Sequence, residues 1–292
     1  MLKHASNCSL SNNTISKEQL LNAIDELNAC GSVGPDLIPP IFVKSCSTVL
    51  IVPLLYMFNN SLSTGIFPSH WKSISITPIH KKGPKNEIEN YRGISILSVF
   101  PKLFESIVRD ILFYNLKQSI SLEQHGFFTG RSTFTNLVQF TNYVTTHLEN
   151  FEQVDVIFTD FSKAFDKLNH SILLNKLSKF GIYGMLFNWI KSYLCNRTQF
   201  VQMAGFLSNI INVTSGVPQG SHIGPLLFLI FINDINTNLN YTNCLLYADD
   251  MKFFSKISSM MDCLAVQNDL NNISIWCEQN KLHLNVSKCK SI

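Results

Sequence analysis

Apolar, strand-like segments that run directly into carboxylates place the tightest constraint on how this chain can fold. Residues 154–159 are β-rich and end at Asp160, and the apolar, strand-like residues 244–254 carry Asp249 and Asp250 in their middle. Segments of this kind are typical of strands that are at least half buried in a sheet. Two such strands can converge in one sheet, so we expect the hairpin that carries Asp249 and Asp250 to face the end of the Asp160 strand.

Two interpretations of these carboxylates remain open. Asp is common at the tip of a tight hairpin, so Asp249-Asp250 can be a plain solvated turn. In the functional interpretation, three carboxylates within about 6 Å repel one another by roughly 3 kcal/mol per pair at an effective dielectric of 20, so the fold needs a cation there. Oxygen ligands select Mg²⁺ or Mn²⁺. A pair of such ions about 4 Å apart serves phosphoryl displacement, which predicts a polymerase or a nuclease without separating the two.

Composition limits the class of protein. The chain has 292 residues, 46% apolar and 15% charged, which is enough to bury a substantial core and too apolar for a disordered protein. Its longest nearly unbroken apolar run, residues 223–232, is interrupted by Gly224 and Pro225. A bilayer span needs roughly 20 apolar residues, so a channel or transporter is excluded. The first five residues lack the apolar stretch of a secretory signal, and we expect an intracellular protein, cytoplasmic or nuclear, that is not secreted and has no membrane partner.

Charge and cysteine usage add little by themselves. The net charge of +3 is too small to predict nucleic-acid binding. The single basic cluster is a loop with Lys81, Lys82, Lys85 and Arg92, which follows a predicted strand at residues 73–79. That cluster is either a solvated loop or a clamp for a triphosphate. The eight cysteines form no C-x-x-C pair, so a zinc ribbon is excluded. Cys277, His283 and Cys289 come nearest to a metal cluster, but isolated small hydrophobes in a reduced compartment are favoured.

Local patterns predict a mixture of helices and strands. Ser16 and Gln19 form a capping box for a helix that Gly31 ends, and Pro101 begins another helix. A third helix is expected over residues 133–148, with its buried face formed by Phe134, Leu137, Val138, Thr141 and Val144. Strands are expected at 199–203 and 210–214, and at 244–248 and 251–254. Because strands and helices do not alternate regularly, the predicted class is α+β around an antiparallel sheet.

Blocks of residues in a fixed order give the chain a resemblance to a known family. Residues 158–166 (FTDFSKAFD), 215–221 (SGVPQGS), 247–250 (YADD) and 284–289 (LNVSKC) resemble the first to fourth catalytic motifs of reverse transcriptases. Upstream blocks are similar to the fingers segments of non-LTR retrotransposon enzymes of the jockey-like kind: Gly34-Pro35-Asp36, Trp71, 78–83, 91–95, 124–127 and 130–132. So many blocks in the right order are far more specific than the YADD sequence alone.

The resemblance implies catalytic roles at matching positions. Asp160 and Asp249 would hold two Mg²⁺ ions, with Mn²⁺ as the alternative ion, and Asp250 would be the third catalytic and metal-binding carboxylate. Phe165 falls at the steric-gate position, where its ring would exclude the 2′-hydroxyl of a ribonucleotide. The alternative for Phe165 is an ordinary core phenylalanine.

The resemblance also implies nucleotide-binding residues. Arg92, together with Lys81 or Lys82, would pair with the triphosphate, for which a guanidinium offers two parallel donors. Gln219 and Gly220 would contact the incoming nucleotide or the template, where a small residue permits close approach of the backbone.

Three further positions are interpreted with the motifs. Lys288 would place a proton near the leaving pyrophosphate, with a solvated lysine as the alternative. Asp166 is interpreted as structural, because a carboxylate early in a helix is favoured by the helix dipole. His222 departs from the aliphatic residue that is usual before the glycine of the second motif.

The implied fold is that of a right-hand polymerase. We expect a flexible leader at 1–15, fingers at 16–150 that are partly interleaved with the palm, and a palm at 151–292 whose antiparallel sheet is backed by helices. The thumb is expected to be missing, since Ile292 comes just after the fourth motif.

The leading functional hypothesis is an RNA-directed DNA polymerase that adds dNTPs to a DNA primer on an RNA template; its protein partners are unknown. The alternatives are a truncated, catalytically silent retrotransposon relic or nucleic-acid-binding remnant, and an RNA-templated RNA polymerase. Phe165 argues against the last of these.

Overall fold

The computed structural model describes residues 14–292, which form two compact units. Unit 1 contains the residues up to Leu116 together with Leu174–Gly224, and unit 2 contains Lys117–Leu173 together with Pro225–Ile292. The predicted boundary between 150 and 151 therefore falls inside unit 2, and the names fingers and palm stay predictions. Residues 1–13 of the expected leader lie outside the described residues. Ile15 is only 2% exposed, and its backbone N–H donates to Asn59, so it is not part of a free leader.

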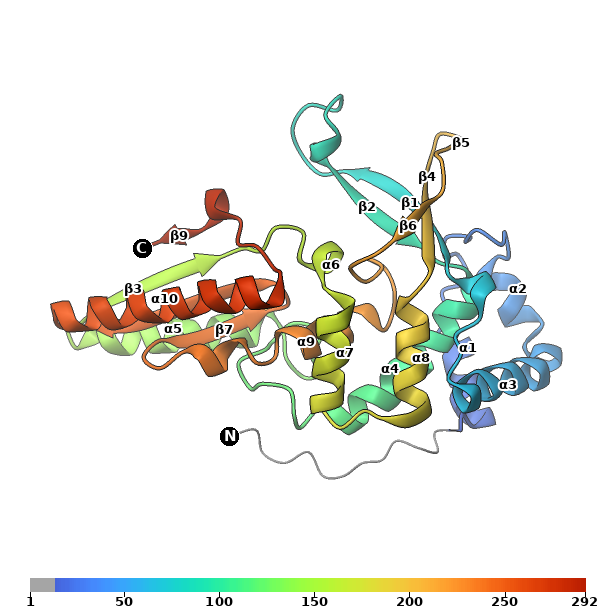
Figure 1. Ribbon diagram of the computed structural model, residues 1–292, viewed down its shortest axis with the longest axis horizontal. Helices are drawn as coiled ribbons and strands as arrows, with labels where there is room; N and C mark the ends of the chain where they lie inside the picture. The colour runs from blue at the N-terminus through green and yellow to red at the C-terminus, as the bar shows by residue number, and fades with distance from the viewer. Residues whose placement is uncertain (1–13) are drawn as a thin grey trace. The chain divides into compact units, whose positions relative to one another are not determined.

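Unit 1 contains a group of helices and a mixed sheet whose strands extend away from them (Figure 1). Its elements are α1 (Lys17–Asp25), α2 (Pro40–Ser45), α3 (Ser47–Thr64), η1 (Ser69–Trp71), β1 (Ser73–His80), η2 (Ile88–Asn90), β2 (Tyr91–Ile96), α4 (Val99–Leu116), α8 (Gly184–Leu194), β4 (Arg197–Met203), β5 (Phe206–Leu207) and β6 (Ile211–Val213). Helix α7 (His170–Lys179) contains the point at which the chain passes from unit 2 to unit 1.

The helix termini of unit 1 show how local sequence sets the elements. The capping box of Ser16 with Gln19 is confirmed. Helix α1 ends at Asp25 and not at Gly31, because the Lys44 ammonium donates to the carbonyls of Asp25 and Leu27 and so satisfies the end of the helix. Helix α4 begins at Val99, so that Pro101 lies in its first turn, where its missing N–H has no helical partner to lose.

The sheet of unit 1 has the order β2-β1-β4-β5, and β6 also pairs with β4. Strand β1 is antiparallel to β2 and parallel to β4, and the register places Ile79 opposite Arg92. Arg92 therefore lies on a strand and not in the loop that was expected to hold the basic cluster. The predicted strands at 199–203 and 210–214 are present as β4 and β6.

The core of unit 1 is aromatic. Phe58 stacks on Phe104 with 4.4 Å between ring centroids, and Trp189 meets Phe104 edge to face at 5.1 Å. Trp189 is fully buried, and its indole N–H donates to the Ser61 hydroxyl at 3.0 Å. These rings join α3, α4 and α8, so the helices of unit 1 share one core.

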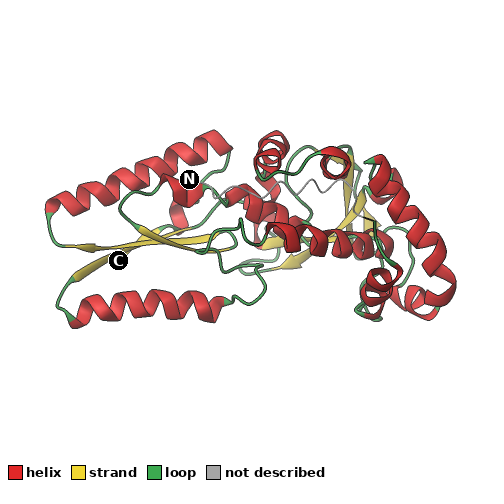
Figure 2. Cartoon of the chain, turned by 90° about the horizontal axis from the view of Figure 1, so that it is seen from below, coloured by secondary structure: helices red, strands yellow, loops and turns green. Residues whose placement is uncertain are grey.

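Unit 2 contains an antiparallel sheet with two long helices running alongside it (Figure 2). Its elements are α5 (Thr133–Glu149), β3 (Gln153–Thr159), α6 (Ala164–Lys167), α9 (Gly224–Ile232, beginning at the last residue of unit 1), η3 (Ile235–Asn238), β7 (Asn243–Tyr247), β8 (Asp250–Ile257), α10 (Met260–Asn280), η4 (Val286–Lys288) and β9 (Lys290–Ser291). The strand order is β7-β8-β3-β9, and every pair is antiparallel.

Helix α5 packs with a different face from the predicted one. Phe134, Leu137 and Val138 are 70%, 53% and 47% exposed, whereas Phe140 and Tyr143 pack against the core of the sheet. The prediction was wrong because long aromatic rings reach Phe254, and because the buried Asn136 amide donates to the Leu246 carbonyl. Residues 136, 140 and 143 therefore lie on the sheet side.

Among the described residues, none of the helices combines the length and the apolar composition that crossing a membrane requires.

Candidate active site

The carboxylates of unit 2 lie at neighbouring strand ends. Strands β3 and β8 pair up to Thr159 opposite Met251, so Asp160 follows β3 where Asp250 begins β8. Strands β7 and β8 pair up to Tyr247 opposite Asp250, which leaves Ala248 and Asp249 as a two-residue turn. Asp250 is thus the first residue of a strand, whereas the sequence suggested that both aspartates form the turn.

The charges around Asp160 and Asp250 interact. Desolvation by burial raises the pKa of Asp250, and the charge of Asp160 raises it further. The Lys288 ammonium lowers the same pKa. Lys288 forms an ion pair with Asp160. The structure therefore brings three predicted site residues together: two carboxylates that repel each other and a cation that contacts one of them.

The fourth motif is held beside Asp160 by backbone pairing. The Asn285 N–H donates to the Asp160 carbonyl at 2.7 Å, and the Ser162 N–H donates to the His283 carbonyl at 2.8 Å. Phe161 and Leu284 form an isolated antiparallel bridge. Lys288 comes from η4, directly after this paired segment, which explains how a residue so distant in sequence reaches Asp160.

A buried glutamine holds the turn that carries Asp249. The Gln124 side chain is 2% exposed, and its Oε1 accepts from the Gly126 N–H at 2.8 Å and from the Ala248 N–H at 2.9 Å. Its Nε2 donates to the Ala248 carbonyl at 3.4 Å. Ala248 has a φ of 57°, the left-handed conformation that a two-residue hairpin requires and that costs an alanine energy. Gln124 thus fixes the strained residue immediately before Asp249.

Segment 123–126 adds backbone contacts to the outer edge of β7. The Leu246 N–H donates to the Glu123 carbonyl, and the His125 N–H donates to the Leu246 carbonyl, both at 2.9 Å. A Cβ on Gly126 would lie 2.3 Å from the Ala248 nitrogen, so only glycine fits there. Block 124–127 is one of the segments that resemble the family, but the resemblance alone does not show that Gln124 and Gly126 hold the turn before Asp249.

Arg131 organises the same segment from the other side. Its Nη1 donates to the carbonyls of Ser121, Leu122 and Gln124, and its guanidinium lies 3.9 Å from the centroid of the Phe128 ring. Arg131 therefore supports the backbone that carries Gln124.

The chemistry of the candidate ligands indicates which metal ions they could bind. The candidate ligands Asp160, Asp249 and Asp250 are all carboxylates, the chemistry that suits Mg²⁺ and Mn²⁺. Across residues 14–292, however, no three His, Cys, Asp or Glu side chains are arranged closely enough to form a ready metal site. Burial raises the pKa of the Cys277 thiol to about 12, so this thiol is not a ready thiolate ligand.

Phe165 lies in α6, a few residues after Asp160. Its ring stacks on Phe228 with 4.5 Å between centroids, and it meets Phe127 edge to face at 6.1 Å. Phe165 is half-buried, with α9 on one side of its ring. Asp166 lies in the first turn of α6, as its structural interpretation requires.

The predicted nucleotide-binding residues, apart from Phe165 and Lys288, belong to unit 1. Arg92 is exposed on β2, and Lys81 and Lys82 are exposed in the connection from β1 to β2. The Ser95 N–H of β2 donates to the Gln219 carbonyl at 2.8 Å. Gly220 has a φ of 124°, and a Cβ there would lie 2.7 Å from the Ser95 carbonyl oxygen. Strand β2 therefore gathers the second motif and Arg92 into one part of unit 1.

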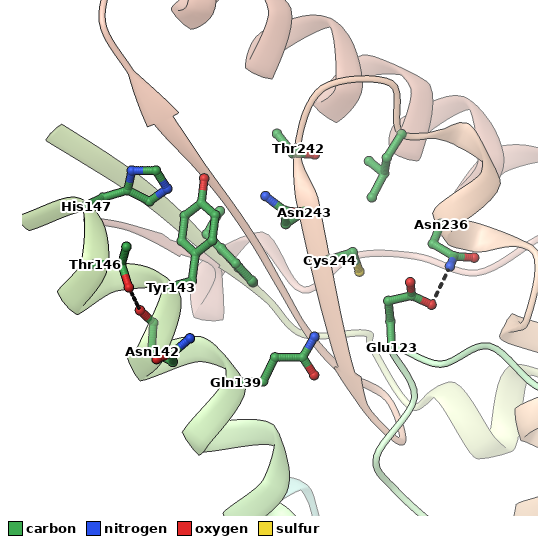
Figure 3. A pocket seen from close by; sticks show the side chains of 12 residues that line it. Glu123, Gln139, Asn142, Tyr143, Thr146, His147, Asn236, Thr242, Asn243 and Cys244 are labelled. Atoms are coloured by element: carbon green, nitrogen blue, oxygen red, sulfur yellow. Dashed lines mark hydrogen bonds between the residues drawn. The ribbon is translucent and has the colours of Figure 1, made fainter. Parts of the chain in front are cut away.

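A polar pocket of about 470 Å³ lies elsewhere in unit 2 (Figure 3). It is lined mainly by amide and hydroxyl side chains of α5 and β7, and Glu123 accepts a hydrogen bond from Asn236 at its side. It contains none of the predicted site residues.

Comparison with known proteins bears on the whole chain. The family described as "Reverse transcriptase (RNA-dependent DNA polymerase)" matches residues 79–292. The "RNA-directed DNA polymerase from mobile element jockey" of Drosophila melanogaster is 30% identical over 295 residues, covering 97% of this chain and 32% of that protein. The "Probable RNA-directed DNA polymerase from transposon BS" of the same species is 31% identical over 285 residues, covering 93% of this chain and 31% of that protein.

The fold has a counterpart among solved structures. The "Structure of apo telomerase from Candida Tropicalis truncated from C-terminal domain" matches with a TM-score of 0.52 and 14% identity, over 78% of this chain and 51% of that one. At this identity the likeness is one of fold alone, and it supports the mixed α+β architecture of a polymerase. The chain spans about a third of the length of the curated relatives it matches. With a family match over residues 79–292, the chain belongs to the reverse transcriptase family.

Proposed function

We propose that this chain is the reverse transcriptase domain of a non-LTR retrotransposon, and that it adds dNTPs to the 3′-hydroxyl of a DNA primer on an RNA template. The observation that carries the proposal is the placement of Asp160 and Asp250 at adjoining strand ends, next to the turn of Asp249. Desolvation and, after it, the charge of Asp160 raise the pKa of Asp250, so bound cations would stabilise this pair of carboxylates.

In this proposal, Asp160, Asp249 and Asp250 hold two Mg²⁺ ions, which when bound neutralise charge on the entering and leaving oxygens. Lys288 neutralises Asp160 in their absence, and in the reaction its ammonium lies near the phosphates that leave. Nucleotidyl transfer needs positioning and charge neutralisation more than other chemistry, so these side chains suffice for the reaction itself.

The residues of unit 1 supply nucleotide binding in this proposal. Arg92, Lys81 and Lys82 pair with the triphosphate, and Gln219 and Gly220 contact the nucleotide or the template. Phe165 excludes the 2′-hydroxyl, which makes the polymer DNA. An RNA template and a DNA product are supported by the names of the relatives, which are RNA-directed DNA polymerases.

Primer extension on an RNA template tests the proposal. We expect Mg²⁺-dependent incorporation of dNTPs by the wild type and a loss of incorporation of at least about a hundredfold in Asp249→Ala. The control is Asp155→Asn, which alters a carboxylate within β3, the strand that precedes Asp160, and it should cause no loss. Phe165→Ala should raise incorporation of ribonucleotides. Equal incorporation by wild type and Asp249→Ala would remove the assigned chemistry, and a wild type that binds primer–template without extending it would favour the silent remnant.

A further inference from the structure

A buried polar cluster in unit 1 is not explained by packing alone. Glu105 of α4 is fully buried, and the side chains of Tyr193 and Arg197 beside it are 0% and 1% exposed. The Arg197 guanidinium lies over the Tyr193 ring at 4.6 Å and donates to the Tyr193 carbonyl at 3.1 Å. A buried carboxyl costs stability unless other groups bond to it, so its contacts indicate what it does.

The carboxyl of Glu105 binds the backbone of the second motif. Its Oε2 accepts from the His222 N–H at 3.0 Å, whereas its Oε1 has no hydrogen-bond partner among the described residues. His222 and Ile223 directly follow the SGVPQGS sequence that carries Gln219 and Gly220. Because the contact is made through the backbone, the departure of His222 from the family pattern leaves it intact.

The same segment has a second attachment on β2. The Gln219 carbonyl accepts from the Ser95 N–H, and Gly220 lies against the Ser95 carbonyl with no room for a Cβ. Within the segment, the Ser221 hydroxyl accepts from the Gly224 N–H at 3.0 Å. Gln219 and Gly220 are therefore fixed between an attachment to a strand and an attachment to a buried carboxyl.

We propose that Glu105 is a positioning residue for nucleotide binding, which holds segment 215–223 so that Gln219 and Gly220 are in place before a nucleotide arrives. A loop that is already ordered loses less conformational freedom when a ligand binds, so affinity rises without a new contact to the ligand. This inference rests on the proposed function, because that proposal assigns Gln219 and Gly220 to the nucleotide.

The experiment compares Glu105→Met, which keeps the volume and removes both acceptors, with Glu105→Gln, which keeps one acceptor. We expect Glu105→Met to raise the KM for dNTPs by about fivefold, the factor that one hydrogen bond supports, with kcat within about twofold. Glu105→Gln should restore most of the affinity. Leu112→Ala, buried on the same helix, is the control for lost stability and should leave KM unchanged.

Hydrogen exchange measures the bond between Glu105 and the backbone of the second motif without requiring polymerase activity. In the wild type, the amide of His222 should exchange about fivefold more slowly than in Glu105→Met, since opening one hydrogen bond costs that factor. If Glu105→Met does not fold, the wild type and Glu105→Gln still decide, because fast exchange of the His222 amide in the wild type overturns the inference. Slow exchange in a wild type that extends no primer removes the proposed function and leaves the contact standing, whereas unchanged exchange and unchanged KM in Glu105→Met refute the inference alone.

Discussion

Gln124 holds the backbone on which Asp249 is carried, and this leads to a prediction about a single side chain. Gln124→Met keeps the volume of the side chain but removes the three hydrogen bonds to Gly126 and Ala248. The left-handed Ala248 is then free to relax, and Asp249 shifts. We expect kcat for primer extension to fall roughly hundredfold, the effect of a displacement of about 1 Å in a catalytic group, while the KM for dNTPs changes little.

A matched control for this change is Gln267→Met, which alters an exposed glutamine of α10 in the same unit. Its kcat should equal that of the wild type. If Gln124→Met loses stability but keeps its kcat, the side chain only packs and does not position Asp249. Steady-state kinetics together with a thermal melt of each variant separate the two results.

Single residues also show where sequence reasoning ends. The proximity of Asp160 to Asp250 follows from two strands that each end in a carboxylate, so a pattern of local residues was enough to expect it. Gln124 and Glu105 act on residues more than a hundred positions away in the chain. No periodicity links such partners, because their contact depends on how complete elements pack, and so neither role was predicted.

At the scale of elements, Asp269 connects helix α10 to the start of β7. The buried carboxylate of Asp269 accepts the backbone N–H groups of Asn240, Tyr241 and Thr242 at 2.8–2.9 Å. Although burial opposes the effect, these bonds hold the pKa of Asp269 below its ordinary value. Its stabilisation is present above the ordinary pKa of an aspartate, near 3.8, and is lost as the pH falls through the lower folded value.

We predict that Asp269→Asn lowers the free energy of unfolding at pH 7 by about 2 kcal/mol, since an amide cannot accept all of these bonds with its NH₂ group. Urea denaturation followed by circular dichroism measures the change. Glu278→Gln on the same helix removes an exposed carboxylate and should leave the midpoint where it is. An equal midpoint in Asp269→Asn would mean that α10 is held to β7 by its apolar contacts alone.

The elements themselves were predicted unevenly. The strands on both sides of Asp249 and the helix starts at Ser16 and Pro101 follow from local chemistry, and in the structure each of these elements begins within two residues of its predicted start. The buried face of α5 was misidentified, because Tyr143 and Asn136 find partners on the sheet that outweigh a stripe of aliphatic residues. Which face of a helix is buried depends on the element that packs against it, and the sequence of the helix does not identify that element.

At the scale of the whole molecule, Glu105 couples stability to pH. Burial raises its pKa from 4.5 to about 7, although the Arg197 charge and the bond from the His222 N–H lower it against that effect. Lys102, Tyr193 and Arg197 are the other ionisable groups coupled to it. Because the folded pKa is raised, the native state holds a proton that the unfolded state has released, and stability is lost as the pH rises through about 7.

We expect the free energy of unfolding of the wild type to fall between pH 5 and pH 8 by roughly 2–3 kcal/mol more than that of Glu105→Gln, which has no such proton to lose. The fluorescence of Trp71 and Trp189 reports on unit 1 during urea denaturation. The comparison with Glu105→Gln cancels the contributions of His125 and His222, whose lowered pKa values act in the opposite sense. Parallel pH profiles for the two proteins would show that Glu105 is ionised throughout this range.

The chain passes between its two units three times, at residues 116–117, 173–174 and 224–225. During synthesis on the ribosome, unit 1 therefore stays incomplete until residue 224 has emerged, while β3 of unit 2 is already outside the exit tunnel and lacks β7, β8 and β9. The edges of β3 therefore stay unpaired in the nascent chain while the roughly ninety codons between the end of β3 and the start of β8 are translated. An unpaired strand edge can pair with other chains, so a chain released by a stop codon soon after residue 224 would keep a site for aggregation.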